Sequence, residues 1–155
     1  MSAFPLTVAG LTTGVLPAAH TCDGARVSPA VAWSGAPAAA VTFALVMSHV
    51  PGEGSTKYNW LLYDIPATAT GIPENERGVG TFGNIDEGGQ NYWPPCPRGA
   101  GTFAYTFTVY ALSGRPDLSA YAPSQVNGTV LRAAIAPLTI SSANVTLTHT
   151  NTVSR

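Results

Sequence analysis

The sequence predicts an all-β domain, and three observations lead to that prediction. The 155 residues include 16 glycines and 13 prolines, which are scattered along the whole chain. Most gaps between them are too short for a typical helix, and β-branched and aromatic residues fill those gaps. This pattern is typical of a β-sandwich. With 45% apolar residues the chain can bury a core, and its length favours a single domain over residues 1–155.

The composition excludes several kinds of partner. Charged residues make up 10% of the chain and the formal net charge is −1, with no basic run, so nucleic acid is not an expected partner. No apolar run approaches the roughly 20 residues of a membrane span. The N-terminal residues Met1–Pro5 lack the basic and then apolar pattern of a signal peptide. The compartment stays open between the cytoplasm and export.

The predicted extended segments can be given in chain order. They are Phe4–Val8, Ser28–Trp33, Val41–Met47, Tyr58–Ile65, Tyr105–Leu112 and Asn144–Thr150. Residues 41–47 are nearly all apolar, which favours a central strand covered on both faces. Residues 144–150 alternate polar and apolar side chains, which predicts a half-exposed strand.

One helix is expected near the C-terminus. Val126, Val130, Leu131, Ala134 and Ile135 fall at helical spacing, with Ser124 as the predicted cap and Pro137 as the stop. Gly128 weakens the prediction, because glycine inside a helix costs about 1 kcal/mol relative to alanine. A loop is predicted at residues 51–56, and residues 67–91 form a long irregular segment of a kind that is often functional.

The most informative stretch is the proline loop, defined as residues 92–101. Its prolines at positions 94, 95 and 97 fix φ and remove backbone donors, so its first half cannot be a helix or a central strand. A stiff loop that leads into a core strand favours the wall of a binding site, although a plain surface connector would have the same pattern. Cys96 lies in it, and Cys22 lies far away in sequence. The two cysteines are either free buried thiols or one disulfide, and without a CxxC motif they indicate no metal.

Several segments, in this order, resemble the phosphatidylethanolamine-binding protein family in its bacterial Raf-kinase-inhibitor-like branch. The matching segments are Thr21–Gly24, Ser28–Pro29 with Trp33, Gly35–Pro37, residues 41–47, Trp60–Ala67, Pro95–Pro97 and Tyr105–Leu112. The resemblance covers nearly the whole chain. It implies a Greek-key β-sandwich of two antiparallel sheets with one or two short helices, and a small pocket that accepts an anion such as a phosphate headgroup.

The polar positions of that pocket depart from the family pattern. Residues 47–51 (Met-Ser-His-Val-Pro) replace the family's Asp-Pro-Asp-x-Pro motif, and Asn59 and Phe103 replace its two histidines. Tyr105 and the loop at 94–97 are retained. The family frame therefore carries a changed pocket.

The resemblance places nine residues around this pocket. They are Met47, His49, Asn59, Trp60, Tyr92, Trp93, Pro95, Phe103 and Tyr105. The set has few donors and much aromatic surface, so we expect weak phosphate binding and better binding of a flat or aliphatic organic molecule. Of the tryptophans, Trp33 and Trp60 fit a core better, whereas Trp93 is the better ligand contact.

Three of these residues could move a proton. His49 could act as a general acid or base or serve as a structural loop histidine, because an unperturbed imidazole titrates near pH 6.5. Asn59 could anchor a ligand carbonyl or satisfy backbone groups, and Tyr105 could donate its hydroxyl or simply pack. His20 and His149 lack the spacing of metal ligands and are expected to be structural.

Three functions remain compatible with the sequence. The first is a non-enzymatic module that binds a small organic ligand. The second is a cofactor-independent enzyme that folds a reactive substrate for cyclisation, a role to which the family resemblance points, with His49, Asn59 or Tyr105 as proton donor or acceptor. The third is inhibition of a kinase or a protease. No metal or cofactor is expected, and the chain could be a monomer or a homodimer.

Overall fold

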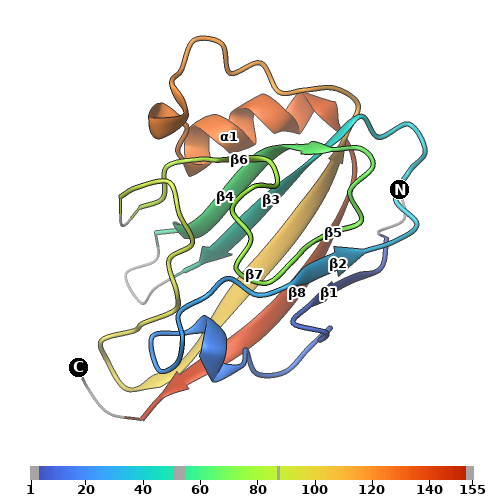
Figure 1. Ribbon diagram of the computed structural model, residues 1–155. Helices are drawn as coiled ribbons and strands as arrows, with labels where there is room; N and C mark the ends of the chain where they lie inside the picture. The colour runs from blue at the N-terminus through green and yellow to red at the C-terminus, as the bar shows by residue number, and fades with distance from the viewer. Residues whose placement is uncertain (1–3, 51–54, 87, 153–155) are drawn as a thin grey trace.

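The computed structural model describes residues 4–50, 55–86 and 88–152, and it is a sandwich of two antiparallel β-sheets (Figure 1). The strands are β1 (Leu6–Val8), β2 (Val31–Trp33), β3 (Thr42–His49), β4 (Lys57–Pro66), β5 (Gly71–Ile72), β6 (Thr81–Phe82), β7 (Gly101–Leu112) and β8 (Thr139–Asn151). The helices are α1 (Gly128–Ile135) and the 3-10 turns η1 (Ala18–His20), η2 (Pro123–Gln125) and η3 (Ala136–Leu138). The predicted fold class is confirmed.

The larger sheet has the strand order β6-β4-β3-β7-β8, and the smaller sheet has the order β1-β2-β5. β3 lies at the centre of the larger sheet with its first six residues buried, as its apolar run predicts. The main core lies between the sheets, where Trp33 of the small sheet meets Phe43 of β3 with ring centroids 5.2 Å apart. Burial of large aromatic side chains on both inner faces holds the two layers together.

A second apolar cluster lies on the outer face of the large sheet, beneath α1 (Figure 1). Leu131 and Ile135 of the helix are buried there. The predicted cap at Ser124 is wrong, because α1 begins three residues later and Asn127 accepts a hydrogen bond from the amide of Val130 at 2.9 Å. Gly128 is the first helical residue, and it packs directly against the ring of Tyr58.

The strands around the candidate site differ in length from the predictions. β7 begins at Gly101, four residues earlier than expected, since its ladder with β8 starts at Gly101 and keeps one register as far as Ala111, with a shift before Leu112. The irregular segment 67–91 contributes only the two-residue strands β5 and β6. Residues 51–54 of the loop predicted at 51–56 lie outside the described residues. Within the described ranges, no helix is long and apolar enough to cross a bilayer.

Candidate functional site

The site is organised by a β-bulge at Asn59. In the β3–β4 ladder Met47 pairs with Trp60, but Ser48 pairs with Tyr58, so Asn59 is the extra residue on β4. Tyr58 packs with the outer cluster and Trp60 with the inner core. A bulge re-aims the side chain of the inserted residue, and such irregularities are common beside functional sites. Here it leaves Asn59 buried, with 3% of its surface exposed.

Asn59 joins His49 to the proline loop. Its side-chain Nδ2 donates to the backbone carbonyl of Trp93 at 3.0 Å. Its backbone carbonyl accepts from the backbone amide of Trp93 at 2.8 Å. The opposite end of the amide, Oδ1, lies 2.6 Å from Nδ1 of His49. Flipping the amide would set Oδ1 against the Trp93 carbonyl, two acceptors in contact, so the network fixes the orientation.

This orientation also fixes the tautomer of His49. Because Oδ1 of Asn59 can only accept, Nδ1 of His49 carries the proton, and in the neutral ring Nε2 keeps a lone pair. Nε2 makes no hydrogen bond to any described residue, and the side chain is half-buried. Imidazole Nε2 is therefore available as an acceptor, or as a donor once the ring is protonated.

Tyr105 lies beside this histidine. The two ring centroids are 4.9 Å apart. Burial raises the pKa of Tyr105 to about 12, so the phenol is neutral at physiological pH and can donate a hydrogen bond. Its hydroxyl has no hydrogen-bond partner within the described ranges. The ring of His49, whose Nε2 can accept a hydrogen bond, therefore lies next to the ring of Tyr105, whose hydroxyl can donate one.

The aromatic members of the predicted set divide into three environments. Trp60 is fully buried and meets the ring of Tyr92 edge-on at 5.2 Å, and Met47 is buried in the same core. Tyr92 donates its hydroxyl to the carbonyl of His20 at 2.7 Å, and burial raises its pKa far above the usual value. Trp93 is 40% exposed. Trp60 and Met47 therefore support the site from the core, as the expectation for Trp60 anticipated.

Phe103 and Pro95 lie at the margins of this arrangement. Phe103 pairs with His149 in the β7–β8 ladder, two residues from Tyr105, and packs half-buried on the core. Pro95 is buried, and its carbonyl accepts a hydrogen bond from the amide of Cys22 at 3.1 Å. Neither residue forms a hydrogen bond or a ring contact with His49 or Asn59 in the described part of the chain, and their part in ligand binding stays a prediction.

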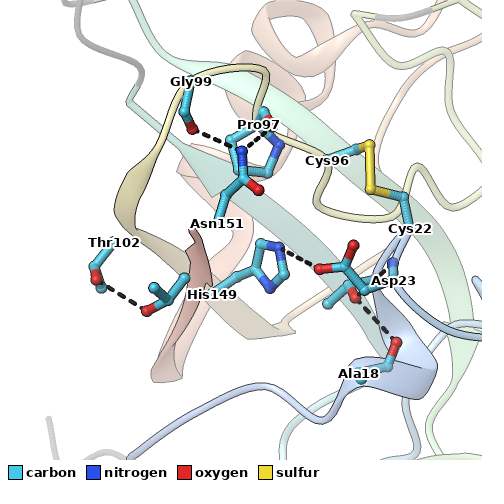
Figure 2. Close-up of polar contacts among 11 residues, drawn as sticks. Ala18, Cys22, Asp23, Cys96, Pro97, Gly99, Thr102, His149 and Asn151 are labelled. Atoms are coloured by element: carbon cyan, nitrogen blue, oxygen red, sulfur yellow. Dashed lines mark hydrogen bonds and ion pairs between the residues drawn. A yellow bond between two sulfur atoms is a disulfide. The ribbon is translucent and has the colours of Figure 1, made fainter. Parts of the chain in front are cut away.

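The first loop of the chain is tied to the proline loop. Cys22 and Cys96 form a disulfide, the second of the two arrangements that the sequence left open. Asn151, at the end of β8, donates from Nδ2 to the carbonyls of Pro97 at 3.0 Å and Gly99 at 2.9 Å (Figure 2). The proline loop is therefore fixed at Trp93, at Cys96 and near Gly99.

Two histidine–carboxylate pairs brace the same region, and sequence reasoning did not anticipate them. Nε2 of His149 lies 3.4 Å from Asp23 (Figure 2), and Nε2 of His20 lies 3.7 Å from Glu74. Both imidazoles are buried, whereas the carboxylates are exposed. The partners are far apart in sequence, so only the folded β8 and the 3-10 turn bring them together. Among the described residues no cluster of three or more metal-ligating side chains is present.

A hollow of about 350 Å³ lies beside the disulfide. It is lined by Cys22, Arg26, Cys96 and residues 91–94. Two predicted ligand residues, Tyr92 and Trp93, belong to this lining, whereas His49, Asn59 and Tyr105 do not. The proline loop therefore lines the hollow through residues 92–94 and 96 and is also hydrogen-bonded to Asn59 through Trp93.

Comparison with known proteins gives a consistent picture. The family model for phosphatidylethanolamine-binding protein matches residues 9–150. A UPF0098 protein of Methanothermobacter thermautotrophicus is 33% identical over 111 residues, covering 68% of this chain and 73% of that protein. A UPF0098 protein of Aquifex aeolicus is 33% identical over 109 residues, and the chain spans only 61% of its length. The crystal structure of the phosphatidylethanolamine-binding protein homologue CT736 from Chlamydia trachomatis superposes with a TM-score of 0.85 at 24% identity, covering 96% of this chain and 98% of that one.

Proposed function

Because the chain belongs to the phosphatidylethanolamine-binding protein family, we propose that it binds a small organic molecule between His49, Tyr105 and the proline loop. The observation that carries the proposal is the pair of unspent polar atoms, Nε2 of His49 and the hydroxyl of Tyr105, on rings 4.9 Å apart. Asn59 holds the first of these rings in one tautomer and ties it to the loop. Tyr92, Trp93, Pro95 and Phe103 complete the proposed lining, and the buried side chains of Met47 and Trp60 support it from the core.

The chemistry of these groups favours a neutral polar ligand. One acceptor beside one donor suits a molecule with a hydroxyl or N–H next to a carbonyl oxygen. The acidic and imidazole groups that the family resemblance would supply are absent at positions 47, 59 and 103. The exposed Lys57 stands opposite His49 in the ladder and is the sole lysine of the chain. Tight phosphate binding through this lysine and a protonated His49 is the result that would overturn the proposal.

The test begins with the protein as purified. Mass spectrometry should identify any molecule that it retains, and calorimetric titrations with inorganic phosphate and phosphoethanolamine should show at most weak binding. His49→Asn retains a donor near Oδ1 of Asn59 but removes Nε2, and Tyr105→Phe removes only the hydroxyl. Each should weaken binding of the retained molecule about tenfold, the effect of losing one hydrogen bond to a ligand. Tyr121→Phe, at an exposed tyrosine distant in sequence, is the matched control and should not.

A second candidate function rests on the same pair of groups. A lone pair on Nε2 beside a neutral phenol is a base beside an acid, and such a pair can move a proton during a cyclisation. Holding the substrate in a near-attack geometry would supply most of the rate. Recovery of a converted product after incubation with the retained molecule's precursor would favour this enzyme, and recovery of an unchanged ligand would favour the binding module.

A further inference from the structure

Arg26 is an unpaired cation in the wall of the hollow beside the disulfide. Its side chain is exposed and makes no hydrogen bond or ion pair with any described residue. Its backbone has φ +66°, the left-handed region that residues with a side chain rarely adopt. A conformation of this kind persists only when the surrounding structure enforces it.

The surrounding structure does enforce it. Cys22, four residues before Arg26, is bonded to Cys96. The next residue, Val27, donates its amide to the carbonyl of Ala19 at 3.1 Å and accepts from Nδ1 of His20 at 2.9 Å. The guanidinium therefore projects from a loop whose backbone is fixed on both sides.

The lining of the hollow also includes an aromatic side chain, Trp93. Trp93 is 40% exposed, whereas Trp33 and Trp60 are 4% and 0% exposed. Its backbone is held by Asn59 through both its amide and its carbonyl. An indole on a fixed backbone can stack on a planar ligand, and ordering it restricts only two side-chain torsions.

We propose that this hollow binds a small planar organic anion, such as an aromatic carboxylate. The ring of the ligand stacks against Trp93, and its carboxylate forms a two-point ion pair with the guanidinium of Arg26. The volume of about 350 Å³ is at the small end of ligand pockets, which suits a molecule of one or two fused rings. The inference stands apart from the proposed function, because His49, Asn59 and Tyr105 do not line the hollow.

The test uses 2-naphthoate and its neutral analogue 2-naphthalenemethanol as probes. Indole N–H signals in a ¹H–¹⁵N spectrum report on the three tryptophans separately, and Trp93→Phe assigns the exposed one. We expect 2-naphthoate to shift the Trp93 signal in a saturable manner and the signals of the two buried tryptophans to stay in place. The neutral analogue should bind at least fivefold more weakly.

Variants then separate the contributions. Arg26→Gln should weaken 2-naphthoate binding about tenfold and leave binding of the neutral analogue unchanged, and Arg26→Lys should recover part of the loss. Arg98→Gln is the matched control, an exposed arginine on the proline loop that does not line the hollow. Equal affinity for the two probes, or no effect of Arg26→Gln, overturns the inference. Loss of 2-naphthoate binding in His49→Asn would place the anion at the other site and also overturn it.

Discussion

Replacement of Asn59 by alanine tests the arrangement on which the proposed site depends. The side chain is 3% exposed and makes two hydrogen bonds, to the carbonyl of Trp93 at 3.0 Å and to Nδ1 of His49 at 2.6 Å. A neutral hydrogen bond contributes about 1 kcal/mol, and a buried group left without a partner costs about 1–3 kcal/mol. His49 is half-buried and can turn to water, whereas the Trp93 carbonyl loses its side-chain donor. Asn59→Ala should therefore lower the free energy of unfolding by about 2–3 kcal/mol.

The assay is urea unfolding followed by the far-ultraviolet circular dichroism signal, with the slope compared between variants. Asn144→Ala is the matched control, because Asn144 is exposed on β8 and its side chain makes no hydrogen bond to any described residue. It should change stability by less than about 0.5 kcal/mol. In Asn59→Ala the amide of Trp93 can still donate to the backbone carbonyl of residue 59, so the proline loop should remain attached. The indole N–H signal of Trp93 should therefore shift but should not move to the position of an unfolded chain. A loss below about 1 kcal/mol in Asn59→Ala would refute the reasoning, since it would mean that the two side-chain hydrogen bonds of Asn59 contribute little to stability.

Three further predictions address the frame of the site. Reduction of the disulfide between Cys22 and Cys96, which are 74 residues apart, should lower the free energy of unfolding by about 4 kcal/mol, because the unfolded chain gains the entropy of an open loop. Guanidinium unfolding with and without reductant measures this change, and a value under about 1 kcal/mol would contradict it. Burial raises the pKa of Tyr105 to about 12 in the folded state, so the stability that its neutral phenol contributes is complete below pH 10 and is lost as the pH rises toward 12. Absorbance at 295 nm should show that Tyr105 ionises late and together with unfolding. Ionisation of all tyrosines near pH 10 would contradict this prediction. Gly128→Ala should lower the melting temperature although alanine has the better helix propensity, because the added methyl group overlaps the ring of Tyr58. The overlap should cost about 1–3 kcal/mol of stability. A higher melting temperature would show that the ring moves aside freely.

The strands and the helix were predictable because their signals are local. The apolar run of β3 and the alternation of β8 follow directly from which faces are buried. Their ends were not predictable in the same way. Gly101 would end an isolated strand, yet it pairs with Asn151 as the first position of the β7–β8 ladder. Ser124 and Asn127 are both good caps, and tertiary packing of Gly128 against Tyr58 fits the start at the second.

The proximity of three candidate residues could be predicted from the sequence, but their geometry could not, and their role in binding stays a prediction. His49, Asn59 and Tyr105 meet as a group, but the bulge that turns Asn59 toward His49 leaves no trace in the residue types around it. The role of Arg26 was missed for a similar reason. An arginine in a turn is ordinarily a solvated charge, and only the folded chain, with its disulfide, brings Arg26 and Trp93 into the lining of one hollow. Long-range pairings of this kind depend on register, which composition does not report.

Salt should weaken ligand binding at the hollow but not at the His49 and Tyr105 pair. At the hollow, the proposed recognition includes an exposed ion pair with Arg26. The Debye screening length falls from about 10 Å at 0.1 M ionic strength to about 3 Å at 1 M. Binding of 2-naphthoate should weaken several-fold over that range, measured by the Trp93 indole signal. The neutral 2-naphthalenemethanol corrects for any salting-out of the ring, and its affinity should hold or rise.

At the His49 and Tyr105 pair, recognition of a neutral molecule uses hydrogen bonds between uncharged groups, so the affinity of the retained molecule should not fall with salt. If its affinity dropped in parallel with that of 2-naphthoate, the ligand would be an anion held by Lys57 or by a protonated His49. The changed residues at positions 47, 59 and 103 would then have moved the family's anion site and not replaced it.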